Sequence, residues 1–210
     1  MDNELVKAIA ELDEGKTLYL VRKRIEAGAT PLEIVEDCRR GVEIVGQNYS
    51  NGTYFLSDLV MSEEILRKVM EILEPHFPPI EKSGGAKVII GTIEGDIHDL
   101  GKNIVAYMLR SAGFDVIDLG VDVEPKAFVD AIVKTGARIV GISVLLTFAI
   151  GAIKKTVDLI KKAGLRDKVK IIIGGYPVNE KVLEYTGADY FENDVMKAVE
   201  LVKKISAGEA

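Results

Sequence analysis

Apolar positions recur with a helical period along the first 82 residues. Leucine, isoleucine, valine and alanine fall three and four positions apart in four stretches, which begin near residues 5, 18, 34 and 59. This spacing is typical of amphipathic helices that bury one face. In 30-TPLE-33, Thr30 is placed as an N-cap and Glu33 as its capping-box partner. Four helices with short connections predict a four-helix bundle.

Prolines and then glycines interrupt this pattern. The segment 74-EPHFPP-79 is followed by 83-SGG-85, and both residue types end helices and loosen the chain. We therefore expect a linker here, with a helical cap domain over residues 1–82 and a second domain over residues 83–210. His76, inside the proline-rich part, is interpreted as a solvated residue without a role.

After the linker, short apolar runs alternate with helical patterns. The runs predict strands near 87–92, 115–118, 138–143, 169–173 and 189–191. The helical spacing predicts helices near 101–112, 125–135, 150–163, 178–186 and 194–206. Strand and helix alternating about five times is typical of a parallel sheet with helices on both faces. The expected fold class is α + α/β, with a Rossmann-like (flavodoxin-like), doubly wound five-stranded parallel sheet in the C-terminal half.

Composition narrows the classes of partner and compartment. The net charge of −6 argues against nucleic acid, which would attract a basic surface. The single cysteine, Cys38, cannot form an internal disulfide or supply the ligands of an iron–sulfur cluster, and it is expected to be a buried thiol. The N-terminus lacks a signal-peptide pattern and no apolar run reaches 18 residues, so a cytoplasmic location is expected.

Polar and glycine-rich segments follow three of the predicted strands. They are 95-GDIHDLGKN-103, 143-SVLLTFA-149 and 174-GGYPVN-179. In open parallel sheets, ligands bind outside the carboxyl ends of the strands, where the strand order reverses. We therefore expect these three loops to form one site.

The first loop is a poor nucleotide site. Gly95 and 101-GKN-103 echo a P-loop, but five residues rather than four separate the glycines. Asn103 occupies the place of the hydroxyl residue that binds magnesium, and the dinucleotide fingerprint Gly-x-Gly-x-x-Gly is absent after the first strand. Nucleotide binding is therefore disfavoured.

Two other ligand classes fit the first loop only in part. A divalent metal held by Glu94, Asp96, His98 and Asp99 remains open, although a single histidine with close-set carboxylates rarely completes a coordination shell. A phosphorylation site of the receiver type requires an aspartate at the end of the third strand, where Ser143 stands.

Taken together, the three loops resemble the corrinoid-binding domain of cobalamin-dependent methyltransferases. The resemblance rests on Asp96-x-His98-x-x-Gly101, Ser143-x-Leu145 and Gly174-Gly175, in that order. It extends to 51-NGTYFLSDLVMSEEI-65, which is similar to the helical cap of the same family, and so covers nearly the whole chain. The small stand-alone corrinoid proteins that serve methanol, methylamine or methoxyaromatic demethylation are the most similar members.

The resemblance implies a corrinoid cofactor, cobalamin or another cobamide, bound base-off and His-on. His98 would be the lower axial ligand of cobalt, and Asp96 would hold its other ring N–H, which fixes the tautomer and increases ligand basicity. These two residues are assigned to the catalytic chemistry. Methionine synthase completes an Asp-His-Ser relay with a serine at the position of Ala149, so control of the axial ligand is expected to be simpler in this chain.

Other positions would contact the cofactor under the same resemblance. Gly101 would let the detached nucleotide tail pass close to the backbone at a helix N-terminus. Hydroxyl groups would bind the tail, Leu145 would pack against it, and paired glycines would leave space for its base. The cofactor-binding residues implied in this domain are Asp96, His98, Asp99, Gly101, Ser143, Leu145, Thr147, Gly174 and Gly175. The neighbouring Lys102 is interpreted as a surface charge.

The cap would cover the upper face of cobalt. Tyr54, Phe55, Leu59 and Val60 are the candidates, because an apolar lid keeps water from a reactive centre. Ordinary packing in the bundle core explains each of them equally well. The linker would be the hinge that gives partners access.

The function that follows is that of a methyl carrier. The protein would shuttle a methyl group on cobalt between a substrate-specific methyltransferase and a second methyltransferase, with a reductive activation protein as a further partner. It would not be an enzyme on its own, and no nucleic-acid or membrane partner is expected. A corrinoid-binding sensor and a metal-dependent hydrolase using Asp96, His98 and Asp99 are the alternatives. The sequence does not identify the methyl donor, the lower base or the oligomeric state.

Overall fold

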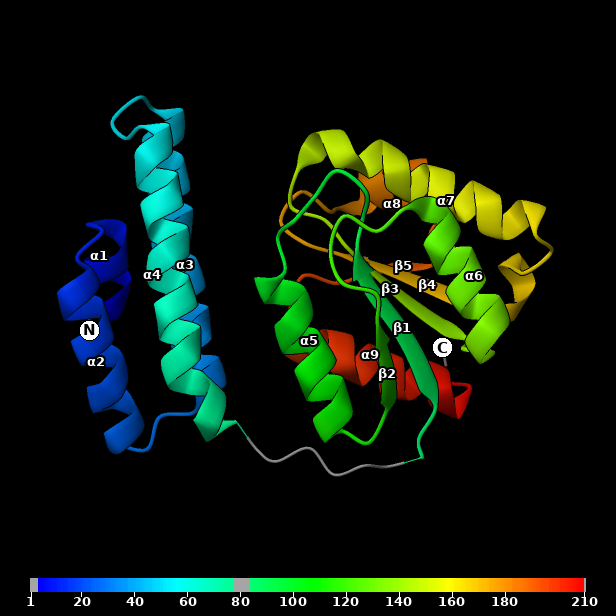
Figure 1. Ribbon diagram of the computed structural model, residues 1–210, viewed down its shortest axis with the longest axis horizontal. Coiled ribbons are helices and arrows are strands. Elements are labelled where there is room, and N and C mark those ends of the chain that lie inside the picture. Colours follow the sequence, from blue (N-terminus) through cyan, green and yellow to red (C-terminus); the bar gives the residue numbers. More distant parts are fainter. Residues whose placement is uncertain (1–3, 78–83, 210) are drawn as a thin grey trace. The chain divides into compact units, whose positions relative to one another are not determined.

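The computed structural model describes residues 4–77 and 84–209 (Figure 1). The chain divides into two compact units, Met1–Pro78 and Pro79–Ala210. The predicted boundary between residues 82 and 83 lies outside the described residues, as does the middle of the predicted linker. None of the helices in the described ranges is long and apolar enough to cross a membrane.

Four helices build the N-terminal unit, as the spacing predicted. They are α1 (Glu4–Ala10), α2 (Glu14–Glu26), α3 (Pro31–Ser50) and α4 (Leu56–Leu73), followed by the 3₁₀ turn η1 (Glu74–His76). The predicted capping box at the start of α3 is confirmed. The Thr30 hydroxyl accepts the Glu33 N–H at 3.3 Å, and the Glu33 carboxylate accepts the Thr30 N–H at 2.8 Å.

The core of this unit is apolar and includes the single cysteine. Its largest fully buried side chains are Leu5, Ile9, Ile34, Ile65 and Leu73. Cys38 belongs to the same cluster, and burial raises the pKa of its thiol to about 12. The thiol therefore stays neutral and unreactive, as a packing residue. His76 is exposed, in agreement with its interpretation as a solvated residue.

The C-terminal unit is built on a five-stranded, all-parallel sheet (Figure 1). Its strands are β1 (Lys87–Thr92), β2 (Asp115–Asp118), β3 (Ile139–Ser143), β4 (Lys170–Gly174) and β5 (Tyr190–Phe191). Each strand was predicted to within one residue at both ends. The strand order β2-β1-β3-β4-β5 is that of a flavodoxin-like fold. From β1 the chain adds β2 on one side and then β3 on the other, so the point where the strand order reverses lies between β1 and β3.

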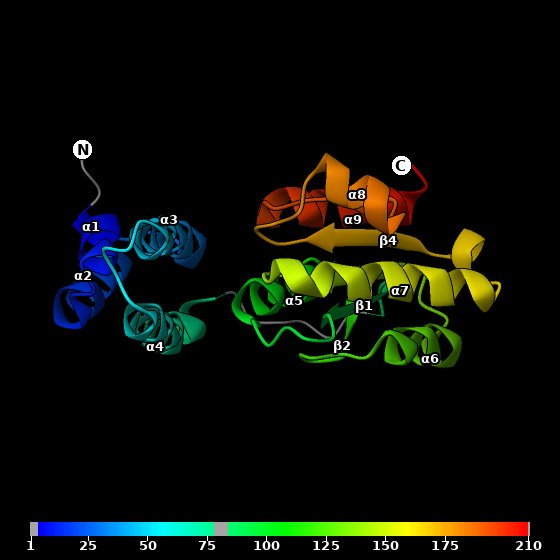
Figure 2. The same ribbon diagram turned by 90° about the horizontal axis from the view of Figure 1, so that it is seen from above.

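Helices cover both faces of the sheet. They are α5 (Leu100–Ser111), α6 (Pro125–Thr135), α7 (Ile150–Lys162), α8 (Glu180–Thr186) and α9 (Val195–Ala207), with the 3₁₀ turns η2 (Thr147–Ala149) and η3 (Arg166–Lys168). Figure 2 shows α8, α7 and α6 side by side. They pack on strand residues such as Ile89 and Ile171, whereas α5 and α9 pack on the alternate residues Val88 and Ile172. This alternation is the period of two that a doubly covered sheet requires.

Candidate functional site

The β1–α5 loop (residues 93–99) leaves the sheet where the strand order reverses. Its first residues continue the parallel pairing beyond β1. The N–H of Ile93 donates to the carbonyl of Ser143 at 3.1 Å, and the N–H of Glu94 donates to the carbonyl of Val123 at 2.9 Å. The end of β3 and the segment after β2 thus hold the loop from both sides.

Asp96 and His98 form the centre of this loop. The Asp96 side chain is fully buried, and its Oδ1 lies 2.6 Å from Nδ1 of His98. The same oxygen accepts the main-chain N–H of His98 at 3.0 Å. Because an ionised carboxylate only accepts hydrogen bonds, Nδ1 is the donor in this contact, and the neutral tautomer that the contact favours has its free lone pair on Nε2. The His98 side chain is 39% exposed, so this imidazole is a ready ligand for a metal.

The second oxygen of Asp96 is bound by main-chain amides. Its Oδ2 accepts the N–H groups of Leu145 and Leu146, at 2.5 and 2.9 Å. Burial alone raises the pKa of Asp96, but the hydrogen bonds from Leu145, His98 and Leu146 outweigh it and hold this pKa below its ordinary value. Ala149, where a relay would place a serine, is buried in the same segment. The carboxylate is therefore ionised and fully occupied without a serine.

Thr92, at the end of β1, also holds the histidine, and sequence reasoning missed it. Its buried hydroxyl donates to the carbonyl of His98 at 2.9 Å. The residue sits in the apolar run that predicted the strand, so nothing in the sequence marked its side chain as functional.

Lys102 is buried, and its interpretation as a surface charge is wrong. Only 3% of the residue is exposed. Its Nζ lies 2.7 and 2.8 Å from the two carboxylate oxygens of Asp118 and 2.6 Å from Oδ1 of Asn103. The first turn of α5 places Lys102 against the end of β2, and this ion pair ties the two elements together. Asp99, the N-cap of α5, accepts the side-chain amide of Asn103 at 2.9 Å.

The structure brings the other predicted loop residues to the same edge of the sheet. Ser143 ends β3, while Leu145 and Thr147 follow it with exposed side chains. Gly174 and Gly175 end β4 and begin the next loop, and a Cβ at Gly175 would lie 1.8 Å from the carbonyl oxygen of Val144. That glycine is required by the close approach of two backbones.

Gly101, unlike Gly175, lies where a side chain would have free space. A Cβ added there would meet no atom within 4 Å, and its φ is an ordinary helical one. Nothing in the fold of the chain itself therefore requires a glycine at this position. An open position next to the candidate metal ligand fits a bound molecule that passes against the backbone of α5.

Exposed apolar side chains occur on four loops at the carboxyl edge of the sheet, including the loop that carries His98. These residues are Ile97, Val121, Leu145, Phe148 and Tyr176. Only Leu145 was among the predicted site residues. The others could have been predicted as site residues because they are large and apolar but lie in loops, where contact with solvent is expected. Such an edge suits a large ligand with apolar faces.

The donor set fits a metal that brings most of its own ligands. Within residues 4–77 and 84–209, no group of three histidine, cysteine or acidic side chains could hold a metal ion. The site offers one imidazole, held by one carboxylate. This geometry fits the axial position of a macrocyclic metal complex, and it gives no support to a hydrolase centre formed by Asp96, His98 and Asp99.

The predicted cap residues lie in the other unit, around the α3–α4 corner (residues 51–61). The hydroxyl of Tyr54 donates to the carbonyl of Ala10 at 2.8 Å and ties the corner to the end of α1. Leu59 is half-buried, whereas Phe55 and Val60 are 72% and 60% exposed. Tyr54 therefore has a structural contact of its own, and Phe55 and Val60 are free of the core of this unit.

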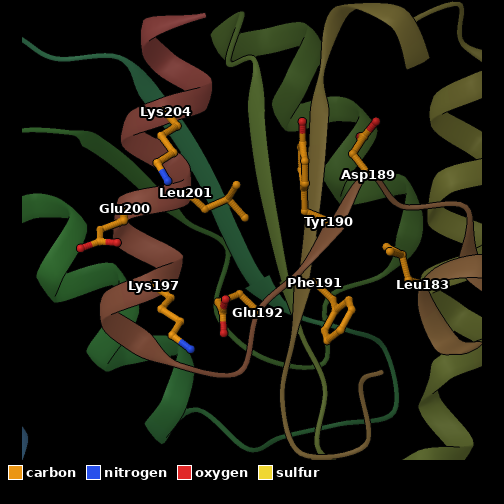
Figure 3. Close-up of a pocket in the computed structure, with 9 residues that line it drawn as sticks. All are labelled: Leu183, Asp189, Tyr190, Phe191, Glu192, Lys197, Glu200, Leu201 and Lys204. Carbon is orange, nitrogen blue, oxygen red and sulfur yellow. The ribbon is translucent and has the colours of Figure 1, made fainter. Parts of the chain in front are cut away.

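A separate cavity of about 520 Å³ lies between α8, β5 and α9 (Figure 3). Figure 3 shows Tyr190 and Phe191 of the edge strand with Leu201 and Lys204 of α9 beside them. One of its three acidic residues, Asp189, accepts the Ile171 N–H at 2.7 Å and pairs with Arg166 at 3.0 Å. None of the predicted site residues lines this cavity, so it is not the candidate site.

Comparisons with known proteins match both units of the chain. Models described as a B12 binding domain match residues 1–74 and residues 86–200. A corrinoid protein of Desulfitobacterium hafniense (strain Y51) is 37% identical over 207 residues, which covers 97% of this chain and 96% of the relative. The solved structure of the Methanosarcina barkeri monomethylamine corrinoid protein matches with a TM-score of 0.87 at 31% identity, covering 97% of each chain. A chain of the methanol:cobalamin methyltransferase complex from Methanosarcina barkeri matches with a TM-score of 0.56 at 29% identity, covering 99% of this chain and 81% of that one.

Proposed function

The chain belongs to the B12 binding domain family of corrinoid proteins, and from this premise we propose that it is a methyl carrier. When bound, the corrinoid supplies a cobalt centre that accepts a methyl group and later gives it up. The chain itself holds the cofactor, orients it and excludes water. We propose no enzymatic activity for the chain alone.

His98 is the proposed lower axial ligand, through Nε2, with the cofactor base-off and His-on. The observation that carries this proposal is the 2.6 Å contact between Nδ1 of His98 and the buried carboxylate of Asp96. The contact fixes the ring and selects the neutral tautomer with its lone pair on Nε2, and an ionised partner makes this imidazole a stronger donor to cobalt.

The tail of the cofactor is proposed to follow the open side of Gly101 and the loops after β3 and β4. Ser143 and Thr147 supply hydroxyl groups there, and Asp99 lies at the start of the helix. Leu145, Gly174 and Gly175 complete the proposed binding set. The open position at Gly101 and the exposed side chain of Leu145 support this path.

The helical unit, with a proposed boundary at residue 82, is proposed to cover the upper face of the corrinoid. Phe55 and Val60 support this role because the core of their own unit does not bury them. Leu59 and Tyr54 would contribute from half-buried positions. We propose that the segment over residues 74–86 is the hinge that lets partner proteins reach the cofactor.

The proposed partners are two methyltransferases and a reductive activation protein. One relative belongs to a methanol:cobalamin methyltransferase complex and another is a monomethylamine corrinoid protein. These relatives support methanol or a methylamine as the class of methyl donor, delivered by a separate substrate-specific methyltransferase. The second methyltransferase would pass the methyl group to its final acceptor.

Electron paramagnetic resonance of the cobalt(II) form tests the axial ligand. The chain is reconstituted with a cobamide, and the spectrum is expected to show splitting from one imidazole nitrogen. His98→Ala should remove this splitting. His76→Ala is the matched control, because His76 is the other histidine of the chain and is exposed in η1. A spectrum that His98→Ala leaves unchanged would overturn the proposal.

A further inference from the structure

Asp122, in the β2–α6 loop (residues 119–124), holds the backbone that carries the proposed axial ligand. Its Oδ1 accepts the N–H of Gly95 at 2.7 Å. Its own N–H donates to the carbonyl of Asp96 at 2.9 Å. The two bonds run in opposite directions between the same two segments, so they join the segments at two adjacent points.

The backbone of Asp122 is in an unusual conformation. Its φ is +51°, in the left-handed region that residues with a side chain rarely adopt. Leu12 is the one other non-glycine residue with a positive φ among those that the structure describes. Aspartate tolerates this region better than most residues because its short side chain bonds to nearby backbone. Here that bond is made to Gly95, and strained residues of this kind concentrate at functional sites.

These contacts complete a clamp around Asp96. From the β3 side, the N–H groups of Leu145 and Leu146 hold its carboxylate. From the β2 side, Asp122 holds its main chain. The carboxylate in turn binds both the main-chain N–H and the ring of His98. Displacement of the Asp122 contact with the Asp96 carbonyl would therefore reach the imidazole through Asp96 alone.

We propose that Asp122 is a positioning residue that sets the orientation of the His98 imidazole before any cofactor binds. It does not touch His98 and acts through Gly95 and Asp96. A ligand held in its bound orientation loses less conformational freedom on binding, so the clamp should increase affinity for the corrinoid. This consequence for affinity rests on the proposed function, whereas the orientation of the ring does not.

Three substitutions separate the two contributions of Asp122. Asp122→Asn keeps a side-chain oxygen for Gly95 and a tolerance for positive φ. Asp122→Gly keeps the backbone conformation and the N–H bond to Asp96, but it removes the acceptor for Gly95. Asp122→Ala removes the acceptor and also disfavours the conformation. The expected order of disturbance is Asn, then Gly, then Ala.

The first measurement is nitrogen-15 NMR of the histidine rings in the cofactor-free chain, in mildly alkaline buffer. The chain has two histidines, so His76 serves as an internal reference. Wild type and Asp122→Asn should show His98 in a single tautomer with the proton on Nδ1. Asp122→Gly and Asp122→Ala should show a mixture of tautomers or broadened His98 signals, while the His76 signals stay unchanged.

The second measurement is cobamide affinity by absorbance titration. Asp122→Ala should weaken binding by about tenfold, the lower end of the range for groups that hold a metal ligand in place. Asp122→Asn should bind like wild type.

The inference would be overturned if the His98 signals of Asp122→Gly and Asp122→Ala were identical to those of wild type. If Asp122→Ala does not fold, the comparison of Gly with Asn decides. A wild-type chain that binds no cobamide would contradict the proposed function, and the NMR comparison would still judge the role of Asp122.

Discussion

The β1–α5 loop and the α3–α4 corner carry predicted site residues of the two units, and they are built in opposite ways. In the loop, both oxygens of the buried Asp96 carboxylate are occupied, by groups of His98, Leu145 and Leu146. At the corner, Phe55 and Val60 project large apolar side chains into solvent. The Asp96–His98 pair is thus positioned by contacts within its own unit, whereas Phe55 and Val60 stay largely exposed in theirs. The substitutions below test this difference, from the largest expected effect to the smallest.

Asp96→Asn should have the largest effect. The side-chain amide of asparagine would point its NH₂ group either at the N–H donors of Leu145 and Leu146 or at those of His98. We expect the free energy of unfolding to fall by roughly 3 kcal/mol, because buried donors lose their acceptor. Urea unfolding of the cofactor-free chain measures this. Asp130→Asn, on the exposed face of α6, is the control and should change it by less than about 0.5 kcal/mol.

Wild type and Asp96→Asn should become more similar in unfolding free energy at acidic pH. The pKa of Asp96 is lowered in the folded chain, so its carboxylate stabilises the fold above the ordinary aspartate pKa of about 3.9. This stabilisation is lost as the pH falls through the lowered pKa. A difference in stability between wild type and Asp96→Asn that stays constant down to this range would contradict the ionised clamp.

Lys102→Ala should have the next largest effect. The substitution leaves Asp118 without its buried partner, and we expect a loss of about 2 kcal/mol in unfolding free energy, below the range for fully buried pairs because Asp118 is partly exposed. Lys126→Ala removes an exposed partner in α6 and should cost less than about 0.5 kcal/mol. Equal losses in thermal and urea unfolding for the two variants would show that the Lys102 pair does not tie α5 to β2.

Phe55→Ala combined with Val60→Ala should have the smallest effect on the free chain. Both side chains are exposed, so the change in unfolding free energy should stay within about 0.5 kcal/mol. Ile65→Ala, at a fully buried position of α4, should cost about 2–5 kcal/mol in the same assay. A double variant as unstable as Ile65→Ala would place the corner in the core and remove the basis for a covering role.

Periodicity predicts the scaffold of this chain well, because the strands alternate with helices and the three central strands, β1, β3 and β4, bury apolar runs. The sequence also predicted the capping box at Thr30, because its hydrogen bonds join residues only three positions apart. The motif likeness singled out Asp96 and His98, which the structure joins. It could not supply the partners of the second Asp96 oxygen, because main-chain N–H groups leave no signature in a sequence.

Two other contacts could not be predicted from the sequence, for different physical reasons. Lys102 reads as a solvated residue because its partner Asp118 lies 16 residues away, on another element. Asp122 looks like any acidic loop residue until its positive φ and its bonds to the β1–α5 loop are known. Contacts that depend on tertiary pairing or on backbone conformation are therefore the part of this site that needed a structure.

The bonds from Leu145 and Leu146 to Asp96 also have a kinetic consequence. They span 49 and 50 residues, and β2 with its two flanking helices lies between their ends. Closing so long a loop costs more chain entropy than a local contact, so we expect these bonds to form after β3 has paired with β1. A nascent chain that has emerged only as far as β2 therefore contains Asp96 and His98 but lacks Leu145 and Leu146, whose N–H groups hold the Asp96 carboxylate. The clamp on Asp96 is complete only when the centre of the sheet has assembled, so we expect cofactor loading to follow folding of this unit.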